Sequence, residues 1–556
     1  MNITRICREP LSPVDNAWFR IGTPTNLAMI SGVITFSEPL DFERLTATIE
    51  VRLLSYQRFG QVVREPKIGP AFWETDPGFN IQNHVYKISM PEPRDHLALQ
   101  RLVSEMMSIP LDKAKPLWEL HYVDNYIEGG ALICRLHHCI ADGVALIQVL
   151  LSAADLEPDV NWPALREEPY PGLSPLARLF VPAVKAARMF QSNWRGARRL
   201  LHGRGESLID VDKVLGFARK GADGGLALGK LLLMLPDRKT FLKGQCGIPK
   251  KAVWSKAIKV SDVKVLGKQM GGTINDILLA AMTGALRRYM LDRGEDVDGL
   301  NIRVLVPVDL RAEDEIDQLG NRFGLVFLSL PIGIEDPVKR LSVLKKRMDT
   351  IKNTPEAVVA FGILSFMGIN PRRIENIIRD IFALKVTAVA TNVPGPRQPL
   401  YMAGGLIDGL MFWVPMSANL SLGMSIISYA EDVIVGVATD AGIIPDPEKI
   451  VVAFQDEFEN LRDYGLALDT NGATPAITTY KQDTGVARDA LPDVGADEGT
   501  VSQAASNAAA RPDVPTEESQ AVPGKCQALT KKGQPCKNRA LSGSSYCRVH
   551  SRQPVE

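Results

Sequence analysis

The chain has 556 residues, of which 45% are hydrophobic and 23% are charged, and its 64 Lys and Arg residues balance 64 Asp and Glu residues. This composition is typical of a globular protein with a large core and excludes a fibrous or largely disordered chain. The zero net charge excludes a global attraction to nucleic acid or membranes, so that any such attraction must be local.

The sequence contains no targeting or membrane-spanning pattern. Its first residues lack an apolar stretch of signal-peptide length, and no run of about 18 apolar residues occurs anywhere. We therefore expect a cytoplasmic protein that associates peripherally with a membrane or with lipid inclusions, from one side only.

Residues 1–155 alternate strand-like and helix-like segments and form the first predicted lobe. Apolar periodicity predicts, in chain order, a strand over 27–36, an amphipathic helix over 41–53, a buried strand over 131–136 and a helix over 143–155.

Residues 156–251 are predicted to connect this lobe to a second one. Between Pro169 and Gly205 this connection has no acidic residue and seven cations, which are Arg178, Lys185, Arg188, Arg195, Arg198, Arg199 and Arg204. Apolar residues alternate with these cations, a pattern that suits an anionic lipid surface. A solvated crossover helix is an equally good interpretation.

Residues 252–467 form the second predicted lobe. A helix is predicted over 273–290, capped by Thr273 or Asn275, with strands over 302–310, 322–332, 385–395 and 432–440. The fold class predicted is α/β of the α+β type, with two lobes that each contain a mixed sheet and helices. Residues 468–524 lose all periodicity and are predicted to be a disordered linker.

The most specific motif is H-H-x-x-x-D-G, formed by His137, His138, Asp142 and Gly143 at the predicted turn between a strand and a helix. A neutral histidine can accept a proton from a nucleophile and return it later. The aspartate can fix the loop or pair with a cation, and the glycine permits close approach of a ligand to the start of the helix.

This motif resembles the signature of the CoA-dependent acyltransferase superfamily, which includes chloramphenicol acetyltransferase and the condensation domains of peptide synthetases. Five further segments resemble, in order, the blocks of the bacterial wax ester synthase/diacylglycerol acyltransferase family. They are PLSPVD (10–15), PLWELHYVD (116–124), GGTINDILLAAMTGALRRY (271–289), LGNRFGLVFLSLP (319–331) and TNVPGPRQPLYMAGG (391–405). The resemblance covers residues 8–467.

The resemblance implies two chloramphenicol-acetyltransferase-like lobes around a central tunnel. It implies transfer of a long acyl group from acyl-CoA to diacylglycerol or a fatty alcohol, which gives triacylglycerol or wax ester without a catalytic cofactor. By position, His138 is the general base, Asp142 keeps the motif loop in shape and Gly143 keeps the channel open. Such a base is needed because an aliphatic alcohol is too weakly acidic to ionise alone.

Side chains alternate along a strand, so only one of the two neighbouring histidines can face the tunnel if the strand continues through the motif. His137 is then a packed support for His138. Cys139 would point with His137 and remains a rival nucleophile, which would require a thiolate beside a base.

An oxyanion donor is expected at the start of the helix over 273–290. The resemblance points to Asn275 and Asp276, whose alternative role is to cap the helix. Arg311 and Asn321 have weaker claims to a functional role. Residues 394–396 are predicted to shape a rigid turn near the tunnel.

Two features depart from the family pattern. Many members have a Pro-Met-His segment where this chain has TPTNLAMISG (23–32), which weakens inference about the acceptor. A tail over 525–552 carries Cys526, Cys536, Cys547 and His550, a set that suits tetrahedral zinc, and free thiols are the alternative. The excess of cations in this tail suits nucleic acid, anionic lipid or an acidic partner.

Two other functions remain open at this point. The first keeps the superfamily but transfers the acyl group to an amine, as condensation domains do, although no carrier-protein or adenylation segment is present. The second is a non-catalytic protein of lipid surfaces, which the intact motif disfavours.

Overall fold

The computed structural model describes residues 8–67, 70–158, 229–231, 233–311, 319–352, 354–417 and 419–471, and the side chains of these up to residue 466. The predicted basic stretch over 169–205, the linker beyond residue 471 and the Cys/His tail lie outside the described residues. The boundaries of the predicted domains therefore stay predictions.

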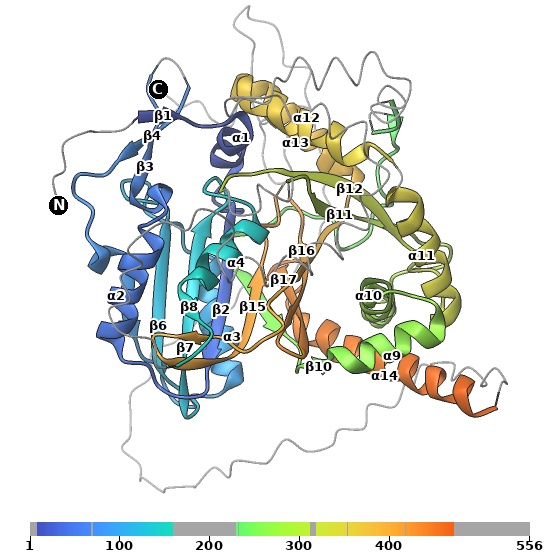
Figure 1. Cartoon of the computed structure of the whole chain (residues 1–556). Coiled ribbons are helices and arrows are strands. Elements are labelled where there is room, and N and C mark those ends of the chain that lie inside the picture. Colours follow the sequence, from blue (N-terminus) through green and yellow to red (C-terminus); the bar gives the residue numbers. More distant parts are fainter. Residues whose placement is uncertain are drawn as a thin grey trace, which may run out of the picture. The chain divides into compact units, whose positions relative to one another are not determined.

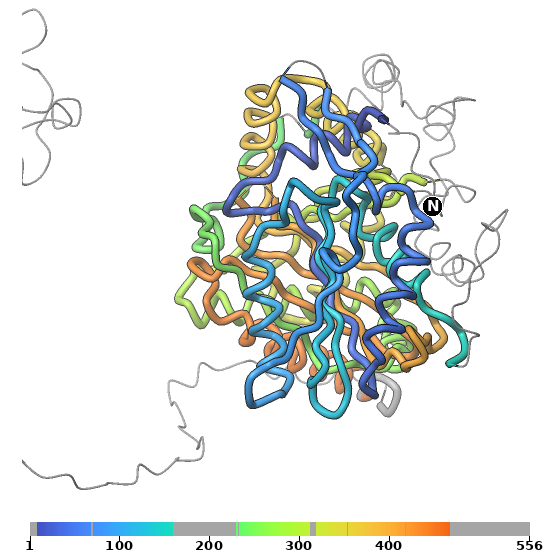
Figure 2. Tube along the Cα trace, turned by 90° about the vertical axis from the view of Figure 1, so that its left-hand side faces the viewer, coloured from blue at the N-terminus to red at the C-terminus, as the bar shows by residue number. Residues whose placement is uncertain are grey.

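A mixed seven-stranded sheet forms around the strand that leads into the motif. Its order is β5 (Val85–Ile88), β6 (Trp118–Tyr126), β7 (Gly129–His137), β2 (Met29–Phe36), β15 (Gly405–Trp413), β14 (Tyr401–Met402) and β8 (Ala154–Asp155). All nine residues of β7 are buried, because the strand is central and covered on both faces. In Figure 2 the molecule is turned so that the blue and cyan strands of this sheet lie towards the reader.

Two strands of this first sheet come from the second half of the chain. β15 pairs antiparallel with β2, so that Trp413 lies opposite Ser31, with a register shift between Ile407 and Gly409. Figure 1 shows β15 in orange beside β2 in blue. The pairing joins the two halves of the chain by backbone hydrogen bonds, and no local sequence pattern predicts it.

A second seven-stranded sheet is built from the second half. Its order is β10 (Ile258–Lys259), β17 (Asp432–Asp440), β16 (Leu422–Tyr429), β13 (Ala388–Pro394), β11 (Ile302–Asp309) and β12 (Phe323–Leu330), with β9 (Lys250–Trp254) also paired to β17. β13 runs parallel to both of its neighbours. The mixed sheets confirm the predicted α/β class with two sheet-based lobes.

A small third sheet consists of β1 (Arg8–Pro10), β4 (Phe72–Thr75) and β3 (Gln61–Arg64). The helices described are α1 (Pro13–Ile21), α2 (Phe42–Leu53), α3 (His96–Met107), α4 (Gly143–Ser152), α9 (Val260–Met270), α10 (Ile274–Asp292), α11 (Pro337–Lys352), α12 (Glu356–Ile369), α13 (Arg372–Lys385) and α14 (Pro447–Asn471), with short 3-10 turns at Gln57–Gly60 and Ile81–Asn83. Within the described ranges, no helix combines the length and apolar character needed to cross a membrane.

The helices and strands predicted within the described residues all occur, with two corrections at their ends. The helix predicted over 143–155 ends at Ser152, because residues 154–155 pair with β14 as a short strand. The strand predicted over 385–395 starts only at Ala388, since Lys385 ends α13. Thr273, rather than Asn275, caps α10.

Helix α1 connects the amino-terminal segment to the second half of the chain. It packs on α12, where the Nδ2 of Asn16 donates to the carbonyl oxygen of Gly368 at 2.7 Å. A Cβ at Gly368 would overlap the carbonyl oxygen of Pro13, so that only glycine permits this approach. The contact fixes the position of Trp18, which α1 carries.

Gly368→Ala tests this close approach. The added methyl must push α1 away from α12, and we expect a loss of about 1–3 kcal/mol in stability, as for overpacked cores, together with lower activity. Urea unfolding measures the first effect. Gly60→Ala, where a Cβ meets nothing within 4 Å, is the control, and equal behaviour of the two variants would contradict the account.

Candidate active site

The motif forms a buried loop between a strand and a helix. β7 ends at His137, residues 138–140 form a turn and α4 begins at Gly143. The Oδ1 of Asp142 accepts a hydrogen bond from the backbone N–H of Ala145 at 3.1 Å, and thereby caps the helix. The strand ends at His137 and does not continue through the motif, so the alternation of side chains along a strand does not decide how His137 and His138 are oriented.

His138 is held by its backbone and by aromatic contacts. Its N–H donates to the carbonyl oxygen of Ala28 at 2.9 Å, and its own carbonyl oxygen accepts from the Nδ2 of Asn321 at 2.8 Å. The imidazole stacks on the ring of Trp18, with centroids 3.9 Å apart and planes inclined by 16°, and the ring of Phe323 lies 5.6 Å away. Both the main chain and the ring of His138 are therefore fixed.

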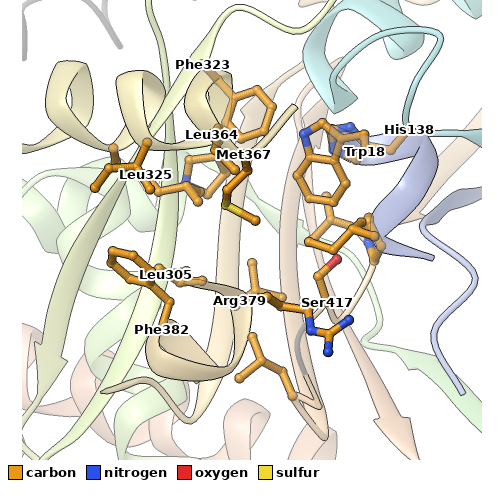
Figure 3. Close-up of a pocket in the computed structure, with 18 of the residues that line it drawn as sticks. Trp18, His138, Leu305, Phe323, Leu325, Leu364, Met367, Arg379, Phe382 and Ser417 are labelled. Atoms are coloured by element: carbon orange, nitrogen blue, oxygen red, sulfur yellow. The ribbon is translucent and has the colours of Figure 1, made fainter. Parts of the chain in front are cut away.

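His138 lines two cavities. The first has an empty volume of about 920 Å³, counting its opening to solvent, and almost all of its walls are apolar. Its lining includes Trp18, Leu305, Phe323, Leu325, Leu364, Met367 and Phe382, which Figure 3 shows arranged around the space beside His138. Apart from His138, the charged or ionisable side chain at its wall is Arg379.

The second cavity has an empty volume of about 1110 Å³, again counting its opening. Most of its wall is apolar, but it carries more polar groups than the first, and we call it the polar cavity. Its lining includes His138, Asp142, Gly143, Asn275, Asp309, Thr391 and Asn392. His138 thus lies between an apolar space and a polar one.

Burial makes the His138 imidazole neutral at physiological pH. Removal from water lowers the pKa of His138 to about 4, although the nearby Asp142 carboxylate acts in the opposite direction. Its Nδ1 has no hydrogen-bond partner among the described residues. A neutral ring of this kind can accept a proton from a bound substrate.

His137 and Cys139 have different surroundings. The Nδ1 of His137 accepts from the backbone N–H of Cys139 at 3.2 Å, and burial lowers the pKa of His137 to about 3. Neither of the two cavities includes His137 or Cys139 in its lining. Burial raises the pKa of the Cys139 thiol well above its usual value, which disfavours the thiolate that a nucleophile requires.

Asp142 also forms a buried ion pair with the second half of the chain. Its Oδ2 lies 2.6 Å from an Nη of Arg311, whose side chain is 2% exposed. Arg311 also contacts the Oδ1 of Asp309 at 3.3 Å and donates to the carbonyl oxygen of Gly320 at 2.5 Å. The cation therefore binds the motif loop to the segment between β11 and β12.

Asn321 forms a second link at the same place. Its Nδ2 donates at 2.8 Å both to the carbonyl oxygen of His138 and to the Oδ1 of Asp15, which lies on α1. Burial raises the pKa of Asp15, while the hydrogen bond from Asn321 opposes this. One amide thus joins α1, the motif and the start of β12.

Asn275 and Asp276 take different positions at the start of α10. Asn275 lines the polar cavity, and its Oδ1 accepts a hydrogen bond from the Nδ2 of Asn392 on β13. Asp276 is fully buried, and its Oδ2 accepts from the N–H and the hydroxyl of Thr273 at 2.9 and 2.8 Å. This capping box engages the carboxylate of Asp276 in a structural role.

Gly143 lines the polar cavity, where a Cβ would meet protein atoms only at 3.8–4.0 Å. These are ordinary contacts, so protein packing does not require glycine here. Gly395, in the turn predicted over 394–396, is different, because a Cβ would overlap the carbonyl oxygen of Ser428. Pro394, in the same turn, lines the polar cavity.

Several residues at the site were missed by sequence reasoning. Trp18, Asp15 and Phe323 surround or support His138, and Asn392 binds Asn275. Asp15, Phe323 and Asn392 occur within the quoted family blocks, which is the signal that could have identified them. Trp18 follows such a block by three residues and has no local signal, because its role depends on how α1 packs.

The predicted metal ligands Cys526, Cys536, Cys547 and His550 lie outside the described residues. Within the part of the chain that is described, no group of three or more His, Cys, Asp or Glu side chains could hold a metal ion.

Comparison with solved structures identifies the class of fold. The first condensation domain of the calcium-dependent antibiotic synthetase aligns with a TM-score of 0.51 and 13% identity, over 83% of this chain and 96% of that domain. The wax ester synthase/diacylglycerol acyltransferase from Marinobacter aquaeolei VT8 aligns with a TM-score of 0.59 and 19% identity, over 82% of this chain and 99% of that protein. The two-lobed fold of these acyl-transfer proteins is therefore shared.

Sequence comparison identifies the family. Residues 11–278 match the wax ester synthase/diacylglycerol acyltransferase catalytic domain, and residues 319–462 match the WS/DGAT C-terminal domain. The Mycobacterium tuberculosis protein named probable diacyglycerol O-acyltransferase tgs1 is 26% identical over 432 residues, which are 76% of this chain and 88% of that relative. The chain belongs to the wax ester synthase/diacylglycerol acyltransferase family, as its motifs predicted.

The Asp142–Arg311 pair generates a prediction about stability. Asp142→Ala removes one of the two carboxylates beside the buried Arg311 cation and also removes a helix cap. We therefore expect the free energy of unfolding to fall by about 3–5 kcal/mol. The urea unfolding midpoint measures it. The double variant Asp142→Ala/Arg311→Met removes both charges and should lose less than the sum of the single variants. A single variant as stable as the wild type would contradict a buried ion pair.

The low pKa of His138 generates a prediction about pH. A base whose folded-state pKa is lowered is active when neutral and loses activity as pH falls through about 4. We expect the acidic limb of the pH profile of kcat/KM to lie near that value. The profile is measured only at pH values at which circular dichroism shows folded protein. Trp18→Ala admits water and should move the limb towards 6.5, whereas Trp18→Phe should move it less. A wild-type limb at or above 6.5 would contradict the burial argument.

Proposed function

We propose that this chain transfers a long acyl group from acyl-CoA to diacylglycerol or to a fatty alcohol, which gives triacylglycerol or wax ester, with His138 as general base. The observation that carries the proposal is the position of His138 between an apolar cavity and a polar one. The named activities of family relatives support the same reaction.

The proposed step is a direct transfer. The acceptor hydroxyl loses its proton to the neutral imidazole of His138 as its oxygen attacks the thioester carbon. The tetrahedral intermediate then collapses, the carbon–sulfur bond breaks, and the proton passes from the imidazolium to the sulfur of CoA. No metal or other cofactor takes part, and acyl-CoA is a substrate.

The environment of His138 supports this role in one respect and limits it in another. The low pKa keeps the ring in its accepting form across the physiological range, but it also makes the ring a weak base. Close positioning can compensate for weak basicity, because a base that is held at hydrogen-bond distance needs no diffusive encounter. The stacking on Trp18 supplies such positioning.

Asn275 is the proposed donor to the oxyanion. The bond from Asn392 uses the Oδ1 of Asn275, so that the NH₂ group is the donor left for the developing charge. Asn275 also lies in the first turn of α10, where backbone N–H groups favour negative charge. The capping of α10 by Thr273 and Asp276 supports a positioning role for Asp276.

Two alternative hypotheses, an acyl-cysteine intermediate and an amine acceptor, have weaker support. A covalent acyl-cysteine on Cys139 would need a thiolate, and burial of the thiol opposes its formation. An amine acceptor shares the fold, as the condensation domain illustrates, but the family match favours a hydroxyl.

We further propose that the protein is cytoplasmic and meets its apolar acceptor at a membrane or lipid inclusion as a peripheral protein. The insolubility of such an acceptor in water supports this. The zinc site of the tail and its affinity for nucleic acid, anionic lipid or an acidic partner stay predictions.

Product analysis with His138→Ala tests the proposal. Labelled palmitoyl-CoA is offered with hexadecanol or dipalmitoylglycerol. We expect wax ester or triacylglycerol from the wild type, and a rate lower by roughly 10²–10⁴-fold in the variant, the usual contribution of a general base. Cys139→Ala is the matched control on the next residue of the motif and should keep most of the activity.

Three results would contradict the proposal. Retained activity in folded His138→Ala would remove His138 as the base. Acyl label bound covalently to the wild-type protein, with both label and activity lost in Cys139→Ala, would favour an acyl-enzyme. Absence of transfer to either acceptor by folded wild-type protein would favour an amine acceptor or a non-catalytic role.

A further inference from the structure

Helix α13 exposes an apolar face to solvent. Ile374, Ile377, Ile381 and Leu384 are 38%, 59%, 42% and 59% exposed. Their spacing of three, four and three residues places them on one side of a helix. Large apolar side chains that gather in one place on a surface mark an interaction site more often than isolated ones do.

Other residues of α13 contact the rest of the protein. Glu375 is buried and pairs with Arg20 of α1 at 2.5 Å, and the partly buried Phe382 packs on the apolar core. These contacts orient α13 so that Ile377 and Ile381 face solvent.

A neighbouring segment extends this surface. Leu233 and Leu235 are 83% and 75% exposed. The backbone N–H of Asp237 donates to the carbonyl oxygen of Leu384 at 2.9 Å, so this segment runs beside the end of α13. We call Leu233, Leu235, Ile374, Ile377, Ile381 and Leu384 the α13 patch.

The same helix forms part of the wall of the apolar cavity. Arg379 and Phe382 line the space that extends to His138, as Figure 3 shows. Phe382 is adjacent in sequence to Ile381 of the α13 patch. A single helix thus presents apolar side chains both to the surface and to the interior of the site.

Charge at the start of α13 indicates the kind of surface. Arg372 and Arg373 are exposed, and Arg372 contacts Glu65 in an exposed ion pair. Exposed ion pairs contribute little, so that Arg372 can exchange its partner for an anionic lipid headgroup at small cost. Apolar residues on one face of a helix with arginines beside them are typical of helices that lie in a membrane interface.

We propose that the α13 patch docks on an anionic lipid surface, from which the apolar acceptor passes around α13 into the cavity beside His138. The docking stands on the patch alone, whereas the passage of the acceptor rests on the function proposed above. A second copy of the chain fits less well, because six side chains are far fewer than the roughly 20–30 residues that a stable interface uses on each side.

Flotation with vesicles tests the docking. The full chain is mixed with vesicles of phosphatidylcholine and phosphatidylglycerol, and Ile377→Glu/Leu384→Glu is compared with the wild type. The variant loses two apolar side chains that would enter the lipid and adds two carboxylates that anionic lipid repels, which should weaken binding by at least about tenfold. The matched control is Leu97→Glu/Val452→Glu, whose side chains on α3 and α14 are 58% and 57% exposed, and it should bind as the wild type does.

A second readout separates docking from catalysis. Transfer to a short alcohol dissolved in water should be unchanged in Ile377→Glu/Leu384→Glu, while transfer to diacylglycerol in vesicles should fall with binding. Equal binding by the wild type and this variant, or no binding by the wild type, would overturn the docking.

Two further results would also overturn the docking. One is a change of oligomeric state in the variant, which would assign the patch to a second copy. The other is protection of the new thiol of Ile377→Cys from labelling in lipid-free protein, which would assign the patch to another part of this chain. Failure of transfer to every acceptor, with binding intact, would instead contradict only the proposed function.

Discussion

The site depends on the buried ion pair between Asp142 and Arg311. It links the motif loop, which follows a strand of the first sheet, to the segment between two strands of the second. Asn321 adds a neutral link in the same place, since one amide binds the carbonyl oxygen of His138 and the carboxylate of Asp15. A buried charge without its partner is costly, so that the two halves of the chain must be assembled before the loop has its shape.

The same burial sets the chemistry of the site. His138 is enclosed by Trp18 and Phe323, which remove water from its ring and keep it neutral. The apolar walls that lower the pKa of His138 also enclose the cavity that we propose for a long aliphatic chain. Exclusion of water thus serves both the proposed base and the proposed binding space, although it makes the imidazole less basic.

Local patterns predicted the elements well because apolar periodicity and capping are properties of short segments, as α10 and β17 illustrate. The motif identified His138 because two adjacent histidines followed by Asp142 and Gly143 are rare. The insertion of β15 beside β2, the approach of α1 to Gly368 and the stacking of Trp18 were not predicted. Each depends on residues more than a hundred positions apart, for which a single sequence contains no distance information. From the sequence alone, Arg311 and Asn321 had only weak claims to a functional role, because their importance comes from their contacts with Asp142, His138 and Asp15.

The most direct test of the central claim is a crystal structure of the protein with a non-reactive thioether analogue of palmitoyl-CoA and a fatty alcohol. We expect the two ligands to enter through the apolar and the polar cavity and to meet at His138. The alcohol oxygen should lie within hydrogen-bond distance of the imidazole, and the methylene carbon that replaces the thioester carbonyl carbon should face the side chain of Asn275. Ligands that occupy the cavities but leave His138 without contact to the alcohol would contradict the account.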